Sequence, residues 1–430
     1  MLSYPYRDVY CLFGLPVDVV SMEQTVQCVR SAITERHRLF LSTPNLNFLI
    51  GSRTNAVLRT SVIDSNLSVA DGMPLVWMAR LLGLPISERV TGSGLFERLL
   101  QSPRPAGARR VSLLGRLMGF SAKEQSVNAD LFQQLLRSGP RSGTTPLRVY
   151  FFGGPPGVAA QAHGRINAVG ATGLRSVGYA CPGFGSVEEM STDAIIDTIN
   201  ATQADILIVA LGAAKGQAWI EHNLKRLTVP VVSHLGAVVN FAAGTVNRAP
   251  LWMQRSGLEW LWRIKEEPGL WRRYWHDGRV LLVLLLTQLL PYALWLRWGG
   301  GRHADRQSGR ISLSNPEAQD PTHEARLTLS GDMVGPLDVD THRVLSQAAC
   351  GGVPLRVDVS AARVIGSGFW AQLLLLRQHL RMVGLPFRLE GASESLRRQM
   401  RWNGVEDLLD VPPPASPTPV LTPTLPPEKP

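Results

Sequence analysis

The first 250 residues of the chain repeat one pattern of apolar and polar positions. Short apolar runs, such as 39–41, 67–70 and 147–152, each lead into a polar or glycine turn and then into a stretch with helical spacing. Alternation of strand and helix is typical of a parallel sheet with helices on its faces. We therefore expect an α/β fold with a Rossmann-like, mostly parallel sheet over residues 1–247.

The sequence pattern predicts particular elements at both ends of this region. Residues 9–17 are expected to form a first strand and turn, and 21–35 a helix that opens with a serine cap. The run at 229–244 is expected to be the last strand with its loop. Between about 101 and 146 the pattern loosens into Pro, Arg, Ser and Gly, which predicts a surface insertion.

The composition changes after residue 247, and the changes divide the rest of the chain. Residues 248–298 form an appendage rich in arginine and tryptophan, and 299–323 are polar enough for a linker. A second alternation of strands and helices over 324–410 predicts a small α/β domain. Residues 411–430 form a Pro-rich tail that we expect to be disordered.

Residues 280–296 are almost entirely apolar, at the short end of the roughly 17–25 residues that span a bilayer. Gln288 and Pro291 interrupt the run, and arginines flank it on both sides, whereas a span should be basic on one side. We favour a helix that lies in or re-enters one leaflet, with a true span or a buried core helix as alternatives. The adjoining Trp/Arg segment suits a membrane interface, or else a helical hairpin that closes the sheet.

The formal charge of +10 requires an anionic partner or surface. Lipid headgroups and diphosphate substrates remain candidates, while no recognised nucleic-acid motif is present, so we expect no nucleic-acid partner. The four cysteines are scattered without metal-ligand spacing, which indicates reduced thiols and no zinc site. The N-terminal residues lack the pattern of a signal peptide.

Polar residues at strand ends are the first candidates for chemistry. Thr43 and Asn45 follow one apolar strand and Asp71 follows the next, and open α/β sheets bind ligands at the carboxyl ends of their strands. Asp71 suits a general base, although an Asp before Pro74 is also a common helix N-cap. Gly153 and Gly154 either bring backbone amides to a phosphate or simply form a tight turn.

An ordered set of short motifs in residues 1–280 resembles the WecG/TagA/CpsF glycosyltransferases, glycosyltransferase family 26. The motifs are T-x-N at Thr43, D-G at Asp71, E-R-V-x-G at 88–92, the glycine turn at 153–158, G-x-x-K before Trp219, R-A-P at 248–250, G-L-E-W-L-x-R at 257–263 and E-P-x-x-x-x-R-Y at 267–274. The resemblance implies inverting transfer of a sugar from a UDP-sugar to a polyprenyl-diphosphate-linked sugar, without metal or other cofactor.

The resemblance also implies roles for individual residues. Asp71 would be the catalytic base, and arginines would meet the phosphates. The substrate-binding set is Thr43, Asn45, Arg89, Gly153, Gly154, Lys215, Gln217, Arg248, Arg255, Arg263 and Arg273. Gly94, Gly216 and Asn240 depart from the family pattern. The Asp338-Val339-Asp340 motif lies in the second domain and does not support a metal-dependent transferase.

Residues 325–409 resemble a STAS domain, through the VDVSAARVIGSGFWAQLLLL run. Ser367 stands where regulatory members are phosphorylated, and it suits either a helix N-cap or a phosphorylation switch. A protein partner is expected for such a domain. The whole chain then reads as a polysaccharide-building transferase, peripheral or re-entrant on the cytoplasmic face of the inner membrane. The alternative is a catalytically degenerate binder of nucleotide sugar or lipid that regulates through its STAS domain.

Overall fold

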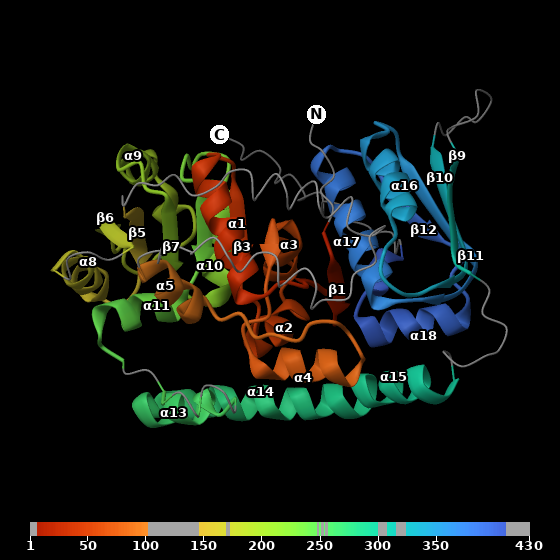
Figure 1. Cartoon of the computed structure of the whole chain (residues 1–430), viewed down its shortest axis with the longest axis horizontal. Coiled ribbons are helices and arrows are strands. Elements are labelled where there is room, and N and C mark those ends of the chain that lie inside the picture. Colours follow the sequence, from red (N-terminus) through yellow and green to blue (C-terminus); the bar gives the residue numbers. More distant parts are fainter. Residues whose placement is uncertain are drawn as a thin grey trace, which may run out of the picture.

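The computed structural model describes residues 7–101, 146–168, 173–246, 249–250, 253, 257–299, 308–314 and 324–409. Two α/β units stand side by side, and a long helical rod runs along the lower side of both (Figure 1). The predicted insertion and the Pro-rich tail lie outside the described residues.

The first unit is built on a six-stranded sheet in the order β4-β3-β8-β7-β5-β6, and every pair in it is parallel. The strands are β3 (Leu39–Ser42), β4 (Leu67–Ser68), β5 (Leu147–Gly153), β6 (Leu174–Ala180), β7 (Ile206–Ala210) and β8 (Val231–His234). Parallel strands buried on both faces read as continuous apolar runs, which is why the sequence pattern located them. The predicted parallel α/β sheet is confirmed.

Helices cover both faces of this sheet. They are α1 (Met22–Thr34), α2 (Leu46–Ser52), α3 (Ala56–Asp64), α4 (Met73–Leu81), α5 (Gly92–Leu100), α8 (Val158–Ala168), α9 (Asp193–Ala201), α10 (Ala213–Asn223) and α11 (Gly236–Ala243), with a 3₁₀ turn at Glu189–Ser191. Side chains of α1, α5, α8 and α11 pack on one face with Phe151, and those of α9 and α10 pack on the other with Tyr150 and Phe152. The alternation of neighbouring β5 residues between two cores fixes the register of this strand.

The two ends of the unit differ from expectation. Residues 9–18 form an antiparallel hairpin, β1 (Val9–Leu12) and β2 (Leu15–Asp18), outside the main sheet. Phe13 and Gly14 both have positive φ (49° and 85°), the geometry of a tight hairpin turn. The segment after β8 was predicted as a loop but is helix α11, which ends at Gly244 in the left-handed conformation.

The rod carries the Trp/Arg segment and the apolar run. It comprises α13 (Glu259–Glu266), a 3₁₀ turn (Pro268–Leu270), α14 (Trp271–Leu284), a π-helical turn (Leu285–Leu289), α15 (Leu290–Leu294) and a second π-helical turn (Trp295–Gly299). By length and composition, Pro268–Trp298 is the one helix among the described residues that could cross a bilayer. Leu284 and Leu289 are buried among side chains of α2 and α4, so the rod lies along the protein (Figure 1).

The second unit holds a four-stranded sheet in the order β12-β11-β10-β9. Its elements are β9 (Arg310–Ser314), β10 (Ala325–Met333), α16 (Val339–Cys350), β11 (Leu355–Ile365), α17 (Ser367–Met382), β12 (Phe387–Glu390), α18 (Glu394–Asn403) and a 3₁₀ turn (Glu406–Leu408). Strand β9 falls in the predicted linker and corrects it: Ile311 and Leu313 pack on the core while alternate residues face outward. Whether this domain is a STAS domain stays a prediction.

The two units share a tight junction. The Ser367 hydroxyl donates to the Cys11 carbonyl at 2.7 Å, and Arg59 of α3 donates to the Gly404 carbonyl at 3.0 Å. A Cβ on Gly14 would lie 2.5 Å from the Gly404 carbonyl oxygen, so only glycine fits there. Val9 and Cys11 belong to the hydrophobic core of the second unit. The second domain is thus packed against the first and is not loosely tethered.

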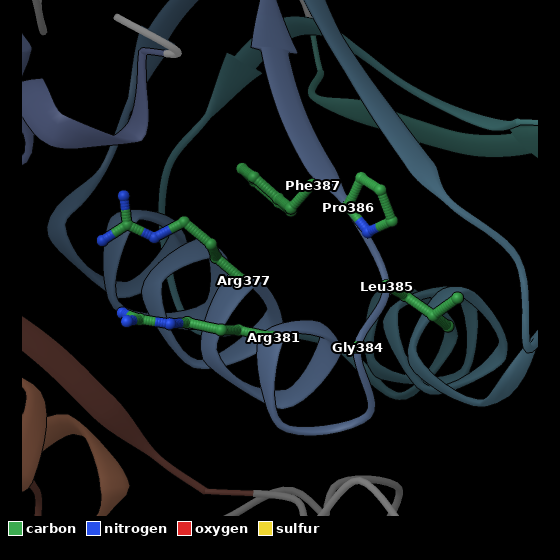
Figure 2. A pocket seen from close by; sticks show the side chains of 6 residues that line it. All are labelled: Arg377, Arg381, Gly384, Leu385, Pro386 and Phe387. Atoms are coloured by element: carbon green, nitrogen blue, oxygen red, sulfur yellow. The ribbon is translucent and has the colours of Figure 1, made fainter. Parts of the chain in front are cut away.

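A hollow of about 340 Å³ lies in the second domain, between the end of α17 and β12. Figure 2 shows it from close by. Arg377 and Arg381 project from α17 on one side of it. Arg377 donates to the Asp407 carboxylate at 2.5 Å, and the charge of Arg381 acts on Asp64 and Glu221 of the first unit. Both guanidinium groups therefore serve contacts within the protein, and the hollow is separate from the sheet edge described next.

Candidate active site

The carboxyl ends of β3 and β4 bring two polar turns into contact. The Asp71 amide donates to the Pro44 carbonyl at 2.9 Å, and the Cβ position of Gly72 lies 3.6 Å from that of Asn45. Thr43 is buried in the first turn. The Asn45 side chain caps α2 by accepting from the amides of Asn47 and Phe48. Adjacent parallel strands therefore place Thr43, Asn45 and Asp71 side by side.

The Asp71 carboxylate is the central group of this edge. Its Oδ2 accepts from the Gly92 amide at 3.4 Å. Burial raises its pKa to about 6, against the opposing effects of Arg263, the Gly92 amide and Arg89. The helix after the turn has Gly72 at its N-cap, so Asp71 does not cap it. A partly buried carboxylate with a raised pKa next to arginines is a typical candidate for proton transfer.

Helix α13 closes over this carboxylate from the rod. The Glu259 carboxylate forms an ion pair with the Arg89 guanidinium at 3.3 Å, and both side chains are less than one-fifth exposed. Arg263 follows one turn later, with its guanidinium 5.8 Å from the Phe241 ring of α11. The ion pair with Arg89 thereby holds helix α13 near Asp71, and the charges of Arg263 and Glu259 act on the Asp71 carboxylate. Sequence reasoning missed Glu259, although it lies inside the quoted G-L-E-W-L-x-R motif.

The other predicted arginines are placed as follows. Arg273 is exposed on α14, over the Tyr274 ring at 5.4 Å. Its charge acts on Asp277, which is buried and joined to the Asn47 side chain of α2. Arg248 and Arg255 lie outside the described residues. Of the predicted phosphate-binding arginines within the described ranges, Arg89 and Arg263 are close enough for their charges to lower the pKa of Asp71, and Arg273 lies farther along the rod.

The glycine turn after β5 has a packing role. Gly153 and Gly154 have φ of 92° and 93°, and a Cβ on Gly153 would lie 2.8 Å from Leu211 and 2.9 Å from the Ala210 carbonyl oxygen. The Gly154 amide already donates to that carbonyl at 2.8 Å. That amide is engaged within the protein, which favours the tight-turn interpretation of these two glycines.

Lys215 and Gln217 on α10 face in different directions. Lys215 is exposed, and its ammonium donates to the Gly185 carbonyl at 2.8 Å, holding the loop after β6. Gln217 is fully buried, with its amide oxygen accepting from the Ser61 hydroxyl at 2.8 Å and its amide nitrogen 3.2 Å from the Ser42 hydroxyl. Gln217 therefore supports the end of β3 from inside the protein and is not one of the proposed substrate contacts.

Gly216 allows a buried histidine at the end of β8. A Cβ on Gly216 would lie 2.2 Å from the His234 ring. His234 Nε2 lies 2.5 Å from the Leu211 carbonyl oxygen, and because a carbonyl only accepts, Nε2 carries the hydrogen. Burial lowers the pKa of His234, so the ring is neutral at neutral pH. Sequence reasoning missed this residue, although it ends a strand as Thr43 and Asp71 do.

Gly216→Ala is expected to lower the free energy of unfolding by about 1–3 kcal/mol, because the new methyl group overlaps the His234 ring. Gly164→Ala is the matched control, since Gly164 is also inside a helix but has open space at its Cβ position. Urea denaturation of both variants measures the difference. Equal stability of the two would contradict the packing role of Gly216.

The other departures also have local structural settings. Thr91 caps α5, and its hydroxyl accepts from the Gly94 amide at 3.0 Å. The Asn240 carbonyl accepts from the Thr245 amide at the end of α11.

Ser367 lies in the junction between domains, where Gly366 is the N-cap of α17 and the serine hydroxyl donates to the Cys11 carbonyl. The N-cap interpretation of Ser367 is therefore wrong. In this conformation the Ser367 hydroxyl is buried and is not accessible to a kinase.

The fold places polar groups at the edge where open α/β sheets bind ligands, and comparison with known sequences identifies the class of enzyme. The sequence model described as "Glycosyl transferase WecG/TagA/CpsF family" matches residues 10–116 and 105–293. The chain therefore belongs to this glycosyltransferase family. It is 23% identical over 234 residues to a protein of Bacillus spizizenii named N-acetylglucosaminyldiphosphoundecaprenol N-acetyl-beta-D-mannosaminyltransferase, a match that covers 54% of this chain and 74% of that one.

Proposed function

We propose that this chain transfers a sugar from a UDP-sugar to a sugar carried on a polyprenyl diphosphate, with inversion, during bacterial surface polysaccharide assembly. The observation that carries the proposal is the Asp71 carboxylate at the carboxyl edge of the sheet, with Arg89 and Arg263 acting on it. The relative's name, which specifies a diphosphoundecaprenol-linked acceptor, supports the same substrate class.

In the proposed step, Asp71 removes the proton from the acceptor hydroxyl. The hydroxyl oxygen attacks the anomeric carbon of the donor from the face opposite UDP, and the bond from that carbon to the β-phosphate oxygen breaks with its electron pair on UDP. One displacement inverts the anomeric centre. With a pKa of about 6, Asp71 is largely ionised at neutral pH and ready to accept a proton.

Cationic side chains of the rod stabilise the departing diphosphate in this proposal. Arg89 is already balanced by Glu259, which leaves Arg263 as the cation on α13 that acts most on the site. Arg273 is exposed on the next helix and can approach a diphosphate that extends along the rod. Arginine suits this role because its planar fork binds phosphate oxygens in pairs.

The acceptor's lipid tail requires a membrane beside the site. The side of the rod away from the protein exposes Leu282, Val283 and Leu286 by 55–58%, and Trp271, Trp275 and Trp298 by 53–74%. An apolar stripe with tryptophans along a helix that lies flat on the protein suits burial in one leaflet. We propose peripheral association with the cytoplasmic face of the inner membrane, because nucleotide-sugar donors are cytoplasmic.

The test is a panel of UDP-sugars, including UDP-N-acetylmannosamine, assayed with a short-chain prenyl-diphosphate N-acetylglucosamine acceptor. We expect one donor to release UDP only when the acceptor is present. Release of UDP without acceptor dependence would contradict transfer. Binding of donors without turnover on any pair would support the degenerate regulator instead.

A further inference from the structure

Helix α18 of the second domain lies directly against the far end of the rod. The centroid of the Trp402 ring of α18 lies 5.6 Å from that of the Tyr292 ring and 5.7 Å from that of the Trp295 ring. The Tyr292 side chain also hydrogen-bonds the Asn403 side chain. Figure 1 shows α18 along the lower side of the second domain, immediately above α15. These contacts place α18 against the protein-facing side of the rod, about one helix diameter from the apolar stripe.

The outward face of α18 is basic. Leu396, Gln399, Met400 and Asn403 are buried against the domain, and the exposed face carries Arg397, Arg398 and Arg401. Spacings of three and four residues bring these arginines onto one side of the helix. Within the described ranges, no carboxylate forms an ion pair with any of them, including Glu394 on the same face. Arg397 uses one nitrogen on the Ala392 carbonyl.

The end of the rod next to α18 shows where a membrane surface would lie. Leu294 is 42% exposed and Trp298 is 74% exposed. Tryptophan concentrates at the boundary between acyl chains and headgroups, and long arginine side chains reach the phosphates from beside it. A basic face beside an exposed apolar helix end matches an anionic bilayer surface, where acyl chains and phosphate headgroups lie next to each other.

We propose that α18 binds anionic phospholipid headgroups, so that the second domain extends the membrane-binding surface of the transferase. The inference rests on the proposed membrane association of the rod. In this arrangement the Trp402 contacts hold α18 next to the rod, and the long arginine side chains extend to the headgroups. The second domain then helps to set the orientation in which Asp71 faces the lipid-linked acceptor.

The test replaces the three arginines together, as Arg397→Gln/Arg398→Gln/Arg401→Gln in the full chain. Co-sedimentation is measured with vesicles of phosphatidylcholine alone and of phosphatidylcholine with phosphatidylglycerol. Each arginine near an anionic surface contributes about 1 kcal/mol, or about fivefold in the binding constant, so we expect a total loss of about 100-fold on the anionic vesicles. On phosphatidylcholine alone the variant and the unmodified chain should bind equally, through the apolar stripe.

The matched control removes the same charge from the opposite, amino-terminal edge of the main sheet, as Arg36→Gln/Arg175→Gln/Lys225→Gln. All three of these side chains are exposed, and the control should keep its preference for anionic vesicles. Equal losses in both variants, or none in the α18 variant, would overturn the inference while leaving the rod's association intact. Failure of the unmodified chain to bind any vesicle would overturn both. Unchanged thermal unfolding and unchanged transfer to a detergent-solubilised acceptor verify that the variant is folded.

Discussion

Replacing Asp71 with asparagine is expected to lower the rate of sugar transfer by about 10²- to 10⁴-fold, the usual contribution of a positioned base. Asparagine keeps the size of the side chain but cannot take the acceptor proton. Donor binding should persist, because no donor contact in the proposal depends on the Asp71 charge. Steady-state kinetics with the acceptor, and calorimetric titration with the UDP-sugar, measure the two effects separately.

Asp64→Asn is the matched control for this variant. Burial also raises the pKa of Asp64 to about 6, but this residue ends α3 and faces Gln378 and Arg381 of the second domain. Its replacement should leave turnover unchanged. The active enzyme should also lose activity as the pH falls through about 6, because Asp71 is then protonated. Turnover by Asp71→Asn at the unmodified rate would remove Asp71 from the mechanism.

Replacing Leu282, Val283 and Leu286 together with serine is expected to release the protein from membranes. These side chains are 55%, 58% and 57% exposed, so the change costs little in folding. Each would contribute about 1.5–3 kcal/mol if fully buried in the leaflet, which predicts a loss of at least about 100-fold in vesicle binding. Flotation with vesicles measures the loss, and transfer to a lipid-linked acceptor in vesicles should fall with it.

Its control is the double change of Met382 and Val383 to serine at the carboxyl end of α17 in the second domain, where the side chains are 60% and 44% exposed. This variant removes similar apolar surface away from the rod and should bind vesicles normally. Deleting the whole apolar run would be a poorer experiment, because Leu284, Leu289 and Tyr292 are buried within the protein. Membrane binding that survives the Leu282/Val283/Leu286 change would contradict the leaflet interpretation of the rod.

Local signals in the sequence located the parts of the site that depend on strand ends. Continuous apolar runs marked the parallel strands, and the turns after β3 and β4 placed Thr43, Asn45 and Asp71 together, because adjacent parallel strands end at the same edge. The serine cap at Ser21 likewise marked the start of α1, and the structure shows that Gln24 completes a capping box there.

The remaining features depend on partners that are distant in the chain. The Arg89–Glu259 pair joins two segments whose meeting no local pattern specifies. Gln217 has a polar side chain of the kind that often contacts substrates. Its amide group instead hydrogen-bonds the buried hydroxyls of Ser42 and Ser61 inside the protein. Gly216 looked like a weakened site position, and only the place of the His234 ring shows why a side chain is absent there.

The contact between Gly14 and Gly404 also constrains how the chain is made. The hairpin of β1 and β2 is synthesised well before its partners Ser367, Asn403 and Gly404, because the contacts join residues 356 and 392 positions apart. Val9 and Cys11 stay without their packing surface during most of translation, and contacts of such long sequence separation form slowly. Nascent chains are therefore expected to pass through a stage in which Val9 and Cys11 are exposed, and chains that end before α17 are expected to remain at that stage.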